Sequence, residues 1–253
     1  MSTDAAGNWP AGYGYLPLGT VTSTMEEGRA RRAELAGPTW ITAEVQTAGR
    51  GRRGRAWANP AGNFAGTLVL PNVSPETAAL RSFVAAVALD EAFVALTGRR
   101  EAFSLKWPND VLLNGGKAAG ILLESLTDKG RITGVMIGIG VNLATAPDPG
   151  TLETGAVAPV SLAGETGLHV TPQEFLEALA PAYARWEAQV RSYGFGPIRQ
   201  AWLARAARLG EQITARLPNE EIAGTFREVD AEGRLVLSTP KGERCIAAGD
   251  VFF

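Results

Sequence analysis

Apolar residues along the chain follow helical spacing in some segments and strand spacing in others. Between positions 75 and 96 they recur three or four residues apart, at Leu80, Phe83, Val84 and Val87, which predicts a helix with one buried face. Short apolar runs bounded by turn residues predict strands at 39–46, 64–70, 103–106, 111–113, 118–126 and 132–143. The last two are apolar on both faces, as expected in the middle of a covered sheet.

A helix start is predicted near the N-terminus, where Ser23 and Glu26 have the spacing of a capping box. This helix should run to about Leu35 and end before Gly37-Pro38. Two further helices are predicted at 172–191 and 197–208, each opening with a proline.

The pattern changes after Leu209 to short strands, predicted at 212–217, 221–229, 234–238 and 243–247. We therefore divide the chain into a main unit, 1–208, and a small all-β unit, 209–253, and predict an α+β fold. About 45 residues are too few for a confident independent core, so the second unit should lean on the first.

Two polar segments interrupt these elements. The stretch 46–63 is long, polar and glycine-rich and lies between two good strands, which is unusual in a compact domain unless the segment binds something or moves. The stretch 144–160 is rich in Pro, Thr and Gly, and we expect a surface excursion there.

Composition and charge exclude several classes. With 24 Lys+Arg against 26 Asp+Glu, the whole surface does not suit coating nucleic acid. The single Cys245 forms no internal disulfide, and the single His169, expected to face solvent, excludes a His-rich metal site. The longest apolar run, 83–89, is too short to span a membrane, and residues 1–18 lack the pattern of a signal peptide. We expect a cytoplasmic protein with no membrane partner.

The most unusual stretch is Gly49-Arg50-Gly51-Arg52-Arg53-Gly54-Arg55. Four arginines in six positions repel one another, so a buried structural role needs an anionic partner. The glycines let the backbone approach a ligand, and amides and guanidiniums together suit phosphate or carboxylate. A solvated basic turn or an arginine-rich nucleic-acid segment is the alternative, though the flanking strands favour a lid over a folded site.

Three other segments carry candidate chemistry. Lys106-Trp107-Pro108-Asn109-Asp110 joins two strands as a turn, with Trp107 expected in the core. In 115–124, Lys117 lies in an apolar strand beside small residues. It either keeps the edge of a sheet soluble or contacts a ligand. In Gly138-Ile139-Gly140-Val141-Asn142, glycines inside a strand indicate close approach of a ligand or another backbone, without the helix of a dinucleotide fingerprint.

These four segments, in this order, resemble the biotin–protein ligases (biotin–[acetyl-CoA-carboxylase] ligases or holocarboxylase synthetases). The resemblance covers about 20–143, and the ending Gly249-Asp250-Val251 looks like that family's C-terminal domain. It implies a mixed β-sheet with helices, class II synthetase-like, plus a small C-terminal β-barrel. It also implies that ATP and biotin form biotinyl-AMP and pyrophosphate, with Mg²⁺, before a lysine of a biotin carboxyl carrier domain takes the biotin.

The resemblance also implies roles for residues that match the family's motifs. Lys117, Arg50 and Arg52 would be catalytic. Biotin would contact Ser23, Thr24, Met25, Gln46, Gly49, Arg50, Gly51, Arg52, Lys117 and Gly120. The nucleotide would contact Arg52, Arg53, Arg55, Trp57, Lys106, Asn109, Asp110 and Asn142. No protein metal ligand is assigned.

The chain departs from the family at Met25, where asparagine is frequent, so one hydrogen bond would become an apolar contact. Only about 20 residues precede Ser23, too few for a DNA-binding module, so we expect no nucleic-acid partner. A homodimer is left open, because the family includes monomers and dimers. The alternatives are a lipoate or octanoate ligase of the same superfamily and a non-catalytic anion-binding module.

Overall fold

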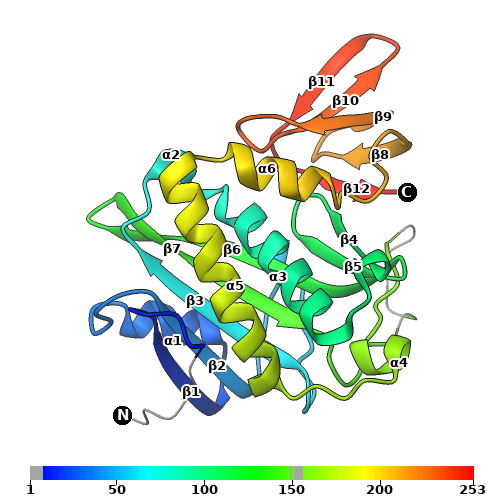
Figure 1. Ribbon diagram of the computed structural model, residues 1–253. Coiled ribbons are helices and arrows are strands. Elements are labelled where there is room, and N and C mark those ends of the chain that lie inside the picture. The colour runs from blue at the N-terminus through cyan, green and yellow to red at the C-terminus, as the bar shows by residue number, and fades with distance from the viewer. Residues whose placement is uncertain (1–7, 149, 151–155) are drawn as a thin grey trace.

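The computed structural model describes residues 8–148, 150 and 156–253 (Figure 1), so part of the excursion at 144–160 lies outside the described residues. Its centre is a mixed sheet of seven strands. In chain order these are β1 (Gly14–Val21), β2 (Thr39–Gln46), β3 (Phe64–Pro71), β4 (Phe103–Lys106), β5 (Asp110–Leu113), β6 (Gly116–Asp128) and β7 (Arg131–Val141). The spatial order is β1-β2-β3-β7-β6-β5-β4, and β1 pairs in parallel with β2 whereas the other neighbours are antiparallel.

Helices cover the sheet on both faces. They are α1 (Thr24–Arg31), α2 (Pro75–Ala78), α3 (Arg81–Thr97), α4 (Leu162–Thr166), α5 (Pro172–Tyr193) and α6 (Gly196–Leu203), with single 3₁₀ turns η1 (Arg52–Gly54) and η2 (Arg100–Ala102). Helices α3 and α5 pack side by side on one face, in front of the sheet in Figure 1. Helix α1 packs on β2, β3 and β7.

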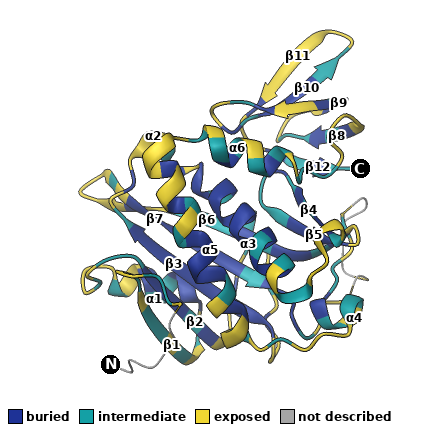
Figure 2. Cartoon of the chain, in the orientation of Figure 1, coloured by how far each residue is buried: buried dark blue, intermediate teal, exposed yellow. Residues whose placement is uncertain are grey.

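Alternation along the strands separates two apolar layers. Trp40 and Leu68 belong to the large core under α3 and α5, whereas their neighbours Ile41 and Val69 belong to a smaller cluster with Met25 of α1. Because successive side chains of a strand point to opposite faces, α1 covers the face away from α3 and α5. Figure 2 shows the central strands and α3 as buried and the outer strand β1 as largely exposed.

A buried ion pair joins the two long helices. Arg81 of α3 and Glu187 of α5 are 5% and 3% exposed, and both Nε and Nη2 of Arg81 donate to the carboxylate, at 3.1 and 2.9 Å. The Tyr183 hydroxyl donates to Glu187 at 3.4 Å, and Arg191 Nε donates to it at 2.8 Å. Burial raises the pKa of the Tyr183 phenol, and the adjacent Glu187 charge adds to that rise.

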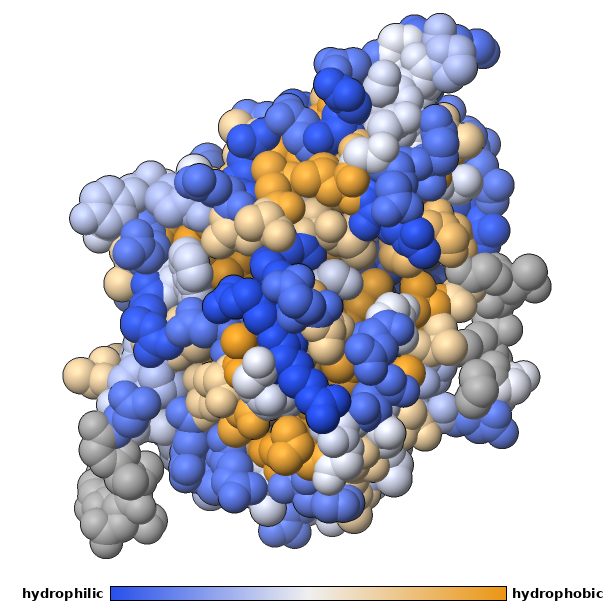
Figure 3. Space-filling model, turned by 45° about the vertical axis from the view of Figure 1, so that its right-hand side comes forward, coloured by the Kyte–Doolittle hydropathy of each residue, from blue (hydrophilic) through white to orange (hydrophobic). Residues whose placement is uncertain are grey.

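The C-terminal unit is a five-stranded antiparallel sheet. Its strands are β8 (Gln212–Arg216), β9 (Glu221–Val229), β10 (Leu235–Thr239), β11 (Gly242–Ile246) and β12 (Asp250–Phe252), in the spatial order β11-β10-β9-β8-β12. The expected small all-β unit is therefore present. Its five strands pair in the order of an open sheet, where a β-barrel was expected. The hairpin of β10 and β11 projects from the body, and this tip is hydrophilic in Figure 3.

This sheet shares its core with the main unit, as its small size predicted. Phe226 of β9 lies 6.4 Å from Trp202 of α6, measured between ring centroids, and both belong to the main hydrophobic core. Trp107, buried as expected, donates from Nε1 to the carbonyl of Gly233 at 3.1 Å.

Most predicted elements are confirmed within a few residues, including the α+β class and the central position of β6 and β7. Strand β1 was missed because Gly14, Pro17 and Gly19 disrupt the strand pattern, and proline is tolerated there because β1 is an outer strand. Short elements α4 and β12 were also missed.

Three predicted helices differ in their limits. The segment 75–96 is divided into α2 and α3, with tighter hydrogen bonds from Leu80 to Thr77 and from Ser82 to Ala79. Helix α1 ends at Arg31 and not near 35. Helix α6 ends at Leu203, because residues after it bond to β4, with Ala207 N donating to Leu105 O at 2.8 Å.

The predicted capping box at the start of α1 is wrong in one half. Ser23 caps the helix, accepting from Met25 N at 3.2 Å, but Glu26 turns away to Arg50, with 2.5 Å between the charged atoms. His169 is exposed, as expected, and Cys245 is exposed as well. Among the described residues, no helix is both long and apolar enough to cross a membrane.

Candidate active site

A cavity of about 300 Å³ opens on the α1 face of the sheet. The start of α1, the arginine-rich loop after β2, strands β6 and β7 and the last strand β12 all line it. Five cationic side chains and two carboxylates line its walls: Arg50, Arg52, Arg55, Lys106, Lys117, Asp110 and Asp250. In a chain with a net charge of −2, this local excess of positive charge indicates a site for anions.

One end of the cavity is polar and uncharged. Gln46 Oε1 accepts from the backbone N and the hydroxyl of Thr24, at 2.8 and 3.1 Å, which fixes the end of β2 against the start of α1. Thr67 donates to the Thr24 hydroxyl at 2.8 Å. The Ser23 oxygen accepts from the backbone, so its O–H remains a donor that can face a carbonyl in the cavity.

Met25 forms an apolar part of the wall next to these groups. It is 3% exposed, and a Cβ added to Gly138 would lie 3.0 Å from its sulfur. Gly138 is therefore a glycine because Met25 packs directly on the backbone of β7. The wall is apolar at this position, and an apolar contact of Met25 with the ligand in place of a hydrogen bond stays a prediction.

The indole of Trp57 lies on a flat floor made by two glycines. Gly120 of β6 and Gly140 of β7 pair across the sheet, and a Cβ on Gly140 would lie 2.2 Å from Trp57 Cε2. On Gly120 it would lie 3.0 Å from the same ring. The glycines of β7 predicted close approach of a ligand or another backbone, whereas at Gly140 the structure has the Trp57 side chain of the loop.

Lys117 projects into the cavity from an interior strand. Since β6 pairs with both β5 and β7, this lysine does not protect a sheet edge. Its Nζ lies 2.8 Å from Asp110 Oδ1 and 5.6 Å from the centre of the Trp57 ring. The side chain is 29% exposed, so it can reach a bound ligand.

The backbone of Lys117 is held by the segment 158–160. Its N donates to Ala158 O at 2.8 Å, and its O accepts from Val160 N at 3.0 Å. Asn142, 2% exposed, donates from Nδ2 to the carbonyls of Lys117 and Val160, at 3.4 and 3.1 Å. Asn142 thus positions the lysine, while its predicted nucleotide contact stays a prediction.

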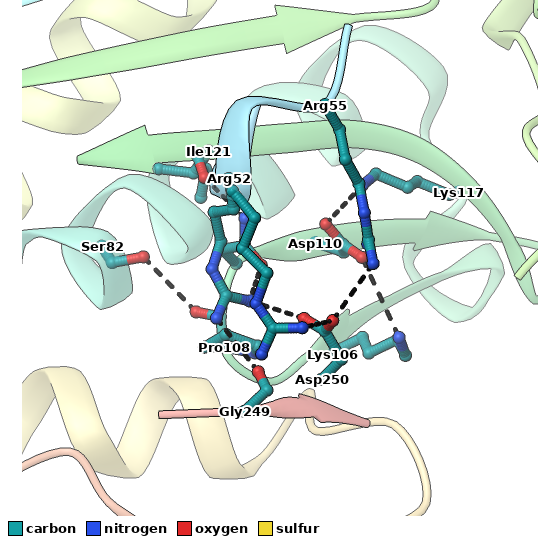
Figure 4. Close-up of polar contacts among 12 residues, drawn as sticks. Arg52, Arg55, Ser82, Lys106, Pro108, Asp110, Lys117, Ile121, Gly249 and Asp250 are labelled. Atoms are coloured by element: carbon teal, nitrogen blue, oxygen red, sulfur yellow. Dashed lines mark hydrogen bonds and ion pairs between the residues drawn. The ribbon is translucent and has the colours of Figure 1, made fainter. Parts of the chain in front are cut away.

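The arginine-rich loop reaches the C-terminal sheet (Figure 4). Asp250 lies 3.4 Å from Arg52 Nη1, 2.7 Å from Arg53 Nη1 and 3.4 Å from Arg55 Nη2. Arg52 also donates to Gly249 O at 3.0 Å and to Asn109 Oδ1 at 3.3 Å. The anionic partner that this run of arginines requires is therefore a residue of β12.

Burial shifts the pKa of two of these cationic side chains. It lowers the pKa of Lys106, with Asp110, 4.0 Å away, opposing the shift and Lys117 adding to it. Burial also lowers the pKa of Arg52, and the Asp250 carboxylate opposes this change. A negatively charged ligand would relieve both, because it returns favourable charge interactions that water no longer supplies.

The cavity brings together most residues that the sequence nominated. Its lining includes Ser23, Thr24, Met25, Gln46, Arg50, Gly51, Arg52, Arg55, Trp57, Lys106, Asn109, Asp110, Lys117, Gly120 and Asn142. Gly49 and Arg53 do not line it. Gly49 is the first residue of the loop, and its carbonyl accepts a hydrogen bond from Trp57 N at 2.9 Å. Arg53 points to Asp250.

Asp250, Val251 and Phe252 were missed as lining residues. The sequence related Gly249-Asp250-Val251 to the family's C-terminal domain, but nothing in it placed this ending beside arginines that lie far away along the chain. Among the described residues, no three acidic, histidine or cysteine side chains cluster as a metal site. Magnesium fits this lining only as an ion carried by a phosphate ligand.

Comparison with known proteins agrees with this geometry. Residues 15–142 match the biotin/lipoate A/B protein ligase family, and residues 209–253 match the biotin protein ligase C terminal domain. A biotin–[acetyl-CoA-carboxylase] ligase of Paracoccus denitrificans is 55% identical over 237 residues, covering 93% of this chain and 99% of the relative. One from Mycobacterium tuberculosis is 30% identical, covering 95% and 90%.

Solved structures share the fold. The biotin protein ligase of Aquifex aeolicus, in complex with biotin and ATP, superposes with a TM-score of 0.79 at 24% identity, covering 94% of this chain and 97% of that one. The fold and the cationic cavity define a ligase that handles anionic substrates. The chain belongs to the biotin/lipoate A/B protein ligase family.

Proposed function

We propose that the protein is an ATP-dependent biotin–protein ligase that acts on a biotin carboxyl carrier domain of a carboxylase. The observation that carries this proposal is the meeting of Lys117 and three loop arginines in one cavity that ends in uncharged hydrogen-bonding groups. Such a cavity suits a molecule with a neutral polar head and a carboxylate, lying beside a triphosphate. The strong similarity to a biotin–[acetyl-CoA-carboxylase] ligase supports the same substrates.

The chemistry has two steps. A carboxylate oxygen of biotin attacks the α-phosphorus of ATP, the bond from that phosphorus to the bridging oxygen breaks, and pyrophosphate leaves. The acceptor lysine amine then attacks the acyl carbon, forming an amide, losing a proton and releasing AMP. Magnesium, bound to the phosphates, would offset charge on the departing pyrophosphate.

Positive charge is the main requirement of the first step, because an anion must approach a phosphorus whose oxygens are themselves negative. Lys117 would move from Asp110 to the reacting oxygens. Arg50 and Arg52 would approach the biotin carboxylate and the phosphates, and Arg55 and Lys106 the nucleotide. Exclusion of water by the loop would protect the mixed anhydride from hydrolysis.

The neutral end would hold the ureido group of biotin. That group has one carbonyl acceptor and two N–H donors, and the hydroxyls of Ser23 and Thr24 can supply both donors and acceptors. Met25 would contact the ring system without a hydrogen bond. The adjacent polar groups distinguish this end from a plain apolar channel, and this favours biotin over lipoate or octanoate.

The test is ATP–pyrophosphate exchange with Mg²⁺, comparing biotin, lipoate, octanoate and no acid. We expect exchange with biotin alone. Exchange with lipoate or octanoate in its place would retain the mechanism and overturn the substrate. A folded protein with no exchange for any acid would instead point to an anion-binding module without catalysis.

Other assignments remain proposals of the same kind. The catalytic unit would span 1–208 and the C-terminal unit 209–253, in the cytoplasm. Absence of a nucleic-acid partner stays a prediction, which a gel shift would test, and sedimentation would decide the oligomeric state that the sequence left open.

Gly140→Val is expected to lower kcat/KM for exchange by about 100-fold, because a side chain at this position takes the space of the Trp57 ring and misplaces the loop. The measurement is exchange at varied biotin and ATP. Gly19→Val, which adds the same side chain in open space on β1, should keep activity within twofold. Equal activities of the two variants would show that the Trp57 position is unimportant.

A further inference from the structure

Asp250 is the point at which the C-terminal sheet meets the arginine-rich loop. It is the first residue of β12, its side chain is only 14% exposed, and both of its carboxylate oxygens face guanidiniums. Arg52 and Arg53 approach different oxygens, while Arg55 shares the oxygen used by Arg53. Figure 4 shows Arg52 and Arg55 reaching from the loop toward this carboxylate.

The loop, 49–55, is also held by the pair of Arg50 with Glu26 and, just after its end, by the packing of Trp57 on two glycines. Its internal backbone bonds are Gly51 N to Arg55 O at 2.8 Å and Arg55 N to Arg52 O at 3.2 Å. Arg53 and Gly54 have φ values of +56° and +72°, which most side chains adopt with difficulty. Mutual repulsion of the arginines also favours an extended loop. The attraction to Asp250 therefore offsets two unfavourable contributions, the positive φ values and the repulsion among the arginines.

A single carboxylate does not use all the binding capacity of these arginines. Each guanidinium has five N–H donors; Asp250 accepts from one nitrogen of Arg53 and one of Arg52, and Arg52 also donates to Gly249 O and Asn109 Oδ1. One negative charge against three positive charges also leaves the cluster strongly cationic. Arginines held in this way are oriented from one side and remain able to bind a phosphate on the other.

We propose that Asp250 is a positioning residue, which holds Arg52, Arg53 and Arg55 in the arrangement that receives the triphosphate and so makes β12 a part of the active site. The nature of the anion rests on the proposed function, whereas the anchoring of the loop does not. Because the arginines are already oriented before binding, they lose less conformational entropy when the triphosphate binds. The contact also explains why the last strand of a separate sheet lines the cavity.

The first test uses the full-length protein without any ligand. Trypsin cleaves after arginine, so the rate of cleavage at residues 50–55, followed by mass spectrometry, reports how often the loop leaves its anchored position. Asp250→Asn should raise this rate about tenfold, because the neutral amide loses the charge-assisted bonds. Glu220→Gln, which breaks an exposed pair with Arg244 in the same sheet, should leave the rate unchanged.

The second test separates positioning from general stability. Asp250→Asn should raise KM for ATP about tenfold and KM for biotin by less, with an unchanged melting temperature, because all three arginines are expected to meet the triphosphate and only Arg52 of the three is expected to reach biotin. Asp250→Glu keeps the charge and should restore most of both losses. A general loss of structure would instead lower the melting temperature and affect both substrates to a similar extent.

The outcomes are separable. If Asp250→Asn leaves both loop cleavage and KM for ATP as in the unchanged protein, the proposal is overturned. If the unchanged protein shows no exchange with any acid, the proposed function fails, yet the trypsin comparison still decides whether Asp250 anchors the loop. If Asp250→Asn fails to fold, Asp250→Glu takes its place. A glutamate variant with normal loop cleavage and normal KM for ATP supports the positioning role of Asp250. A glutamate variant whose loop is cleaved about ten times faster contradicts it.

Discussion

Lys117→Ala is expected to lower ATP–pyrophosphate exchange by a factor of about 1,000 or more, because it removes the cation closest to the point of attack. The fold should tolerate the change. The pair that Lys117 makes with Asp110 is partly exposed, so its loss should cost no more than about 1 kcal/mol and shift the melting temperature by only a few degrees.

The matched control is Lys241→Ala, which removes an exposed lysine from the β10–β11 hairpin. Its exchange rate should equal that of the unchanged protein. Lys117→Arg should remain impaired, since a planar guanidinium does not replace a compact ammonium between two reacting oxygens. Exchange by Lys117→Ala within tenfold of normal would remove this lysine from the mechanism.

Arg81→Met should have the opposite effect to Lys117→Ala. Arg81 lies outside the cavity, and its replacement should greatly lower the stability of the protein. It leaves Glu187 charged and 3% exposed, with Arg191 as its remaining cation. Breaking a buried pair by removing one partner costs about 3–5 kcal/mol, so we expect the melting temperature to fall by about 6–15 °C. Denaturant unfolding followed by circular dichroism gives the free energy directly.

A second variant tests the cause of that loss. Replacing both partners, as Arg81→Met with Glu187→Met, removes the isolated charge and should recover more than half of the lost free energy. Arg244→Met, which breaks an exposed pair, should cost less than about 1 kcal/mol. If the double variant is no more stable than Arg81→Met alone, the stranded charge of Glu187 is not the cause of the loss.

Two predictions made from the sequence have different origins. Strands β6 and β7 were predicted as interior strands because their apolar residues appear on both faces, a property readable from neighbouring positions. The arginine-rich loop was predicted as an anion site because its own charges repel. In both cases the information lies within a few residues of the chain.

The errors are also physical. Strand β1 contains Gly14, Pro17 and Gly19, which weaken the strand pattern, and its pairing with β2 makes up for this. The last residues predicted for α6 bond to Leu105 and leave the helix. Glu26 has capping-box spacing, yet its attraction to Arg50 decides its direction. Local preferences are small, and tertiary contacts reversed them.

By itself, the sequence identified the α+β class and the segments that line the cavity, because residue type, period and charge act over short stretches of chain. The roles of Lys117 and the loop arginines came from the family resemblance and stay predictions. Only the tertiary structure decided that Trp57 rests on Gly120 and Gly140, and that Asp250 meets Arg52 across 198 positions. Coulomb attraction and van der Waals contact depend on distance in space, and a single long-range pair leaves no periodic pattern along the chain.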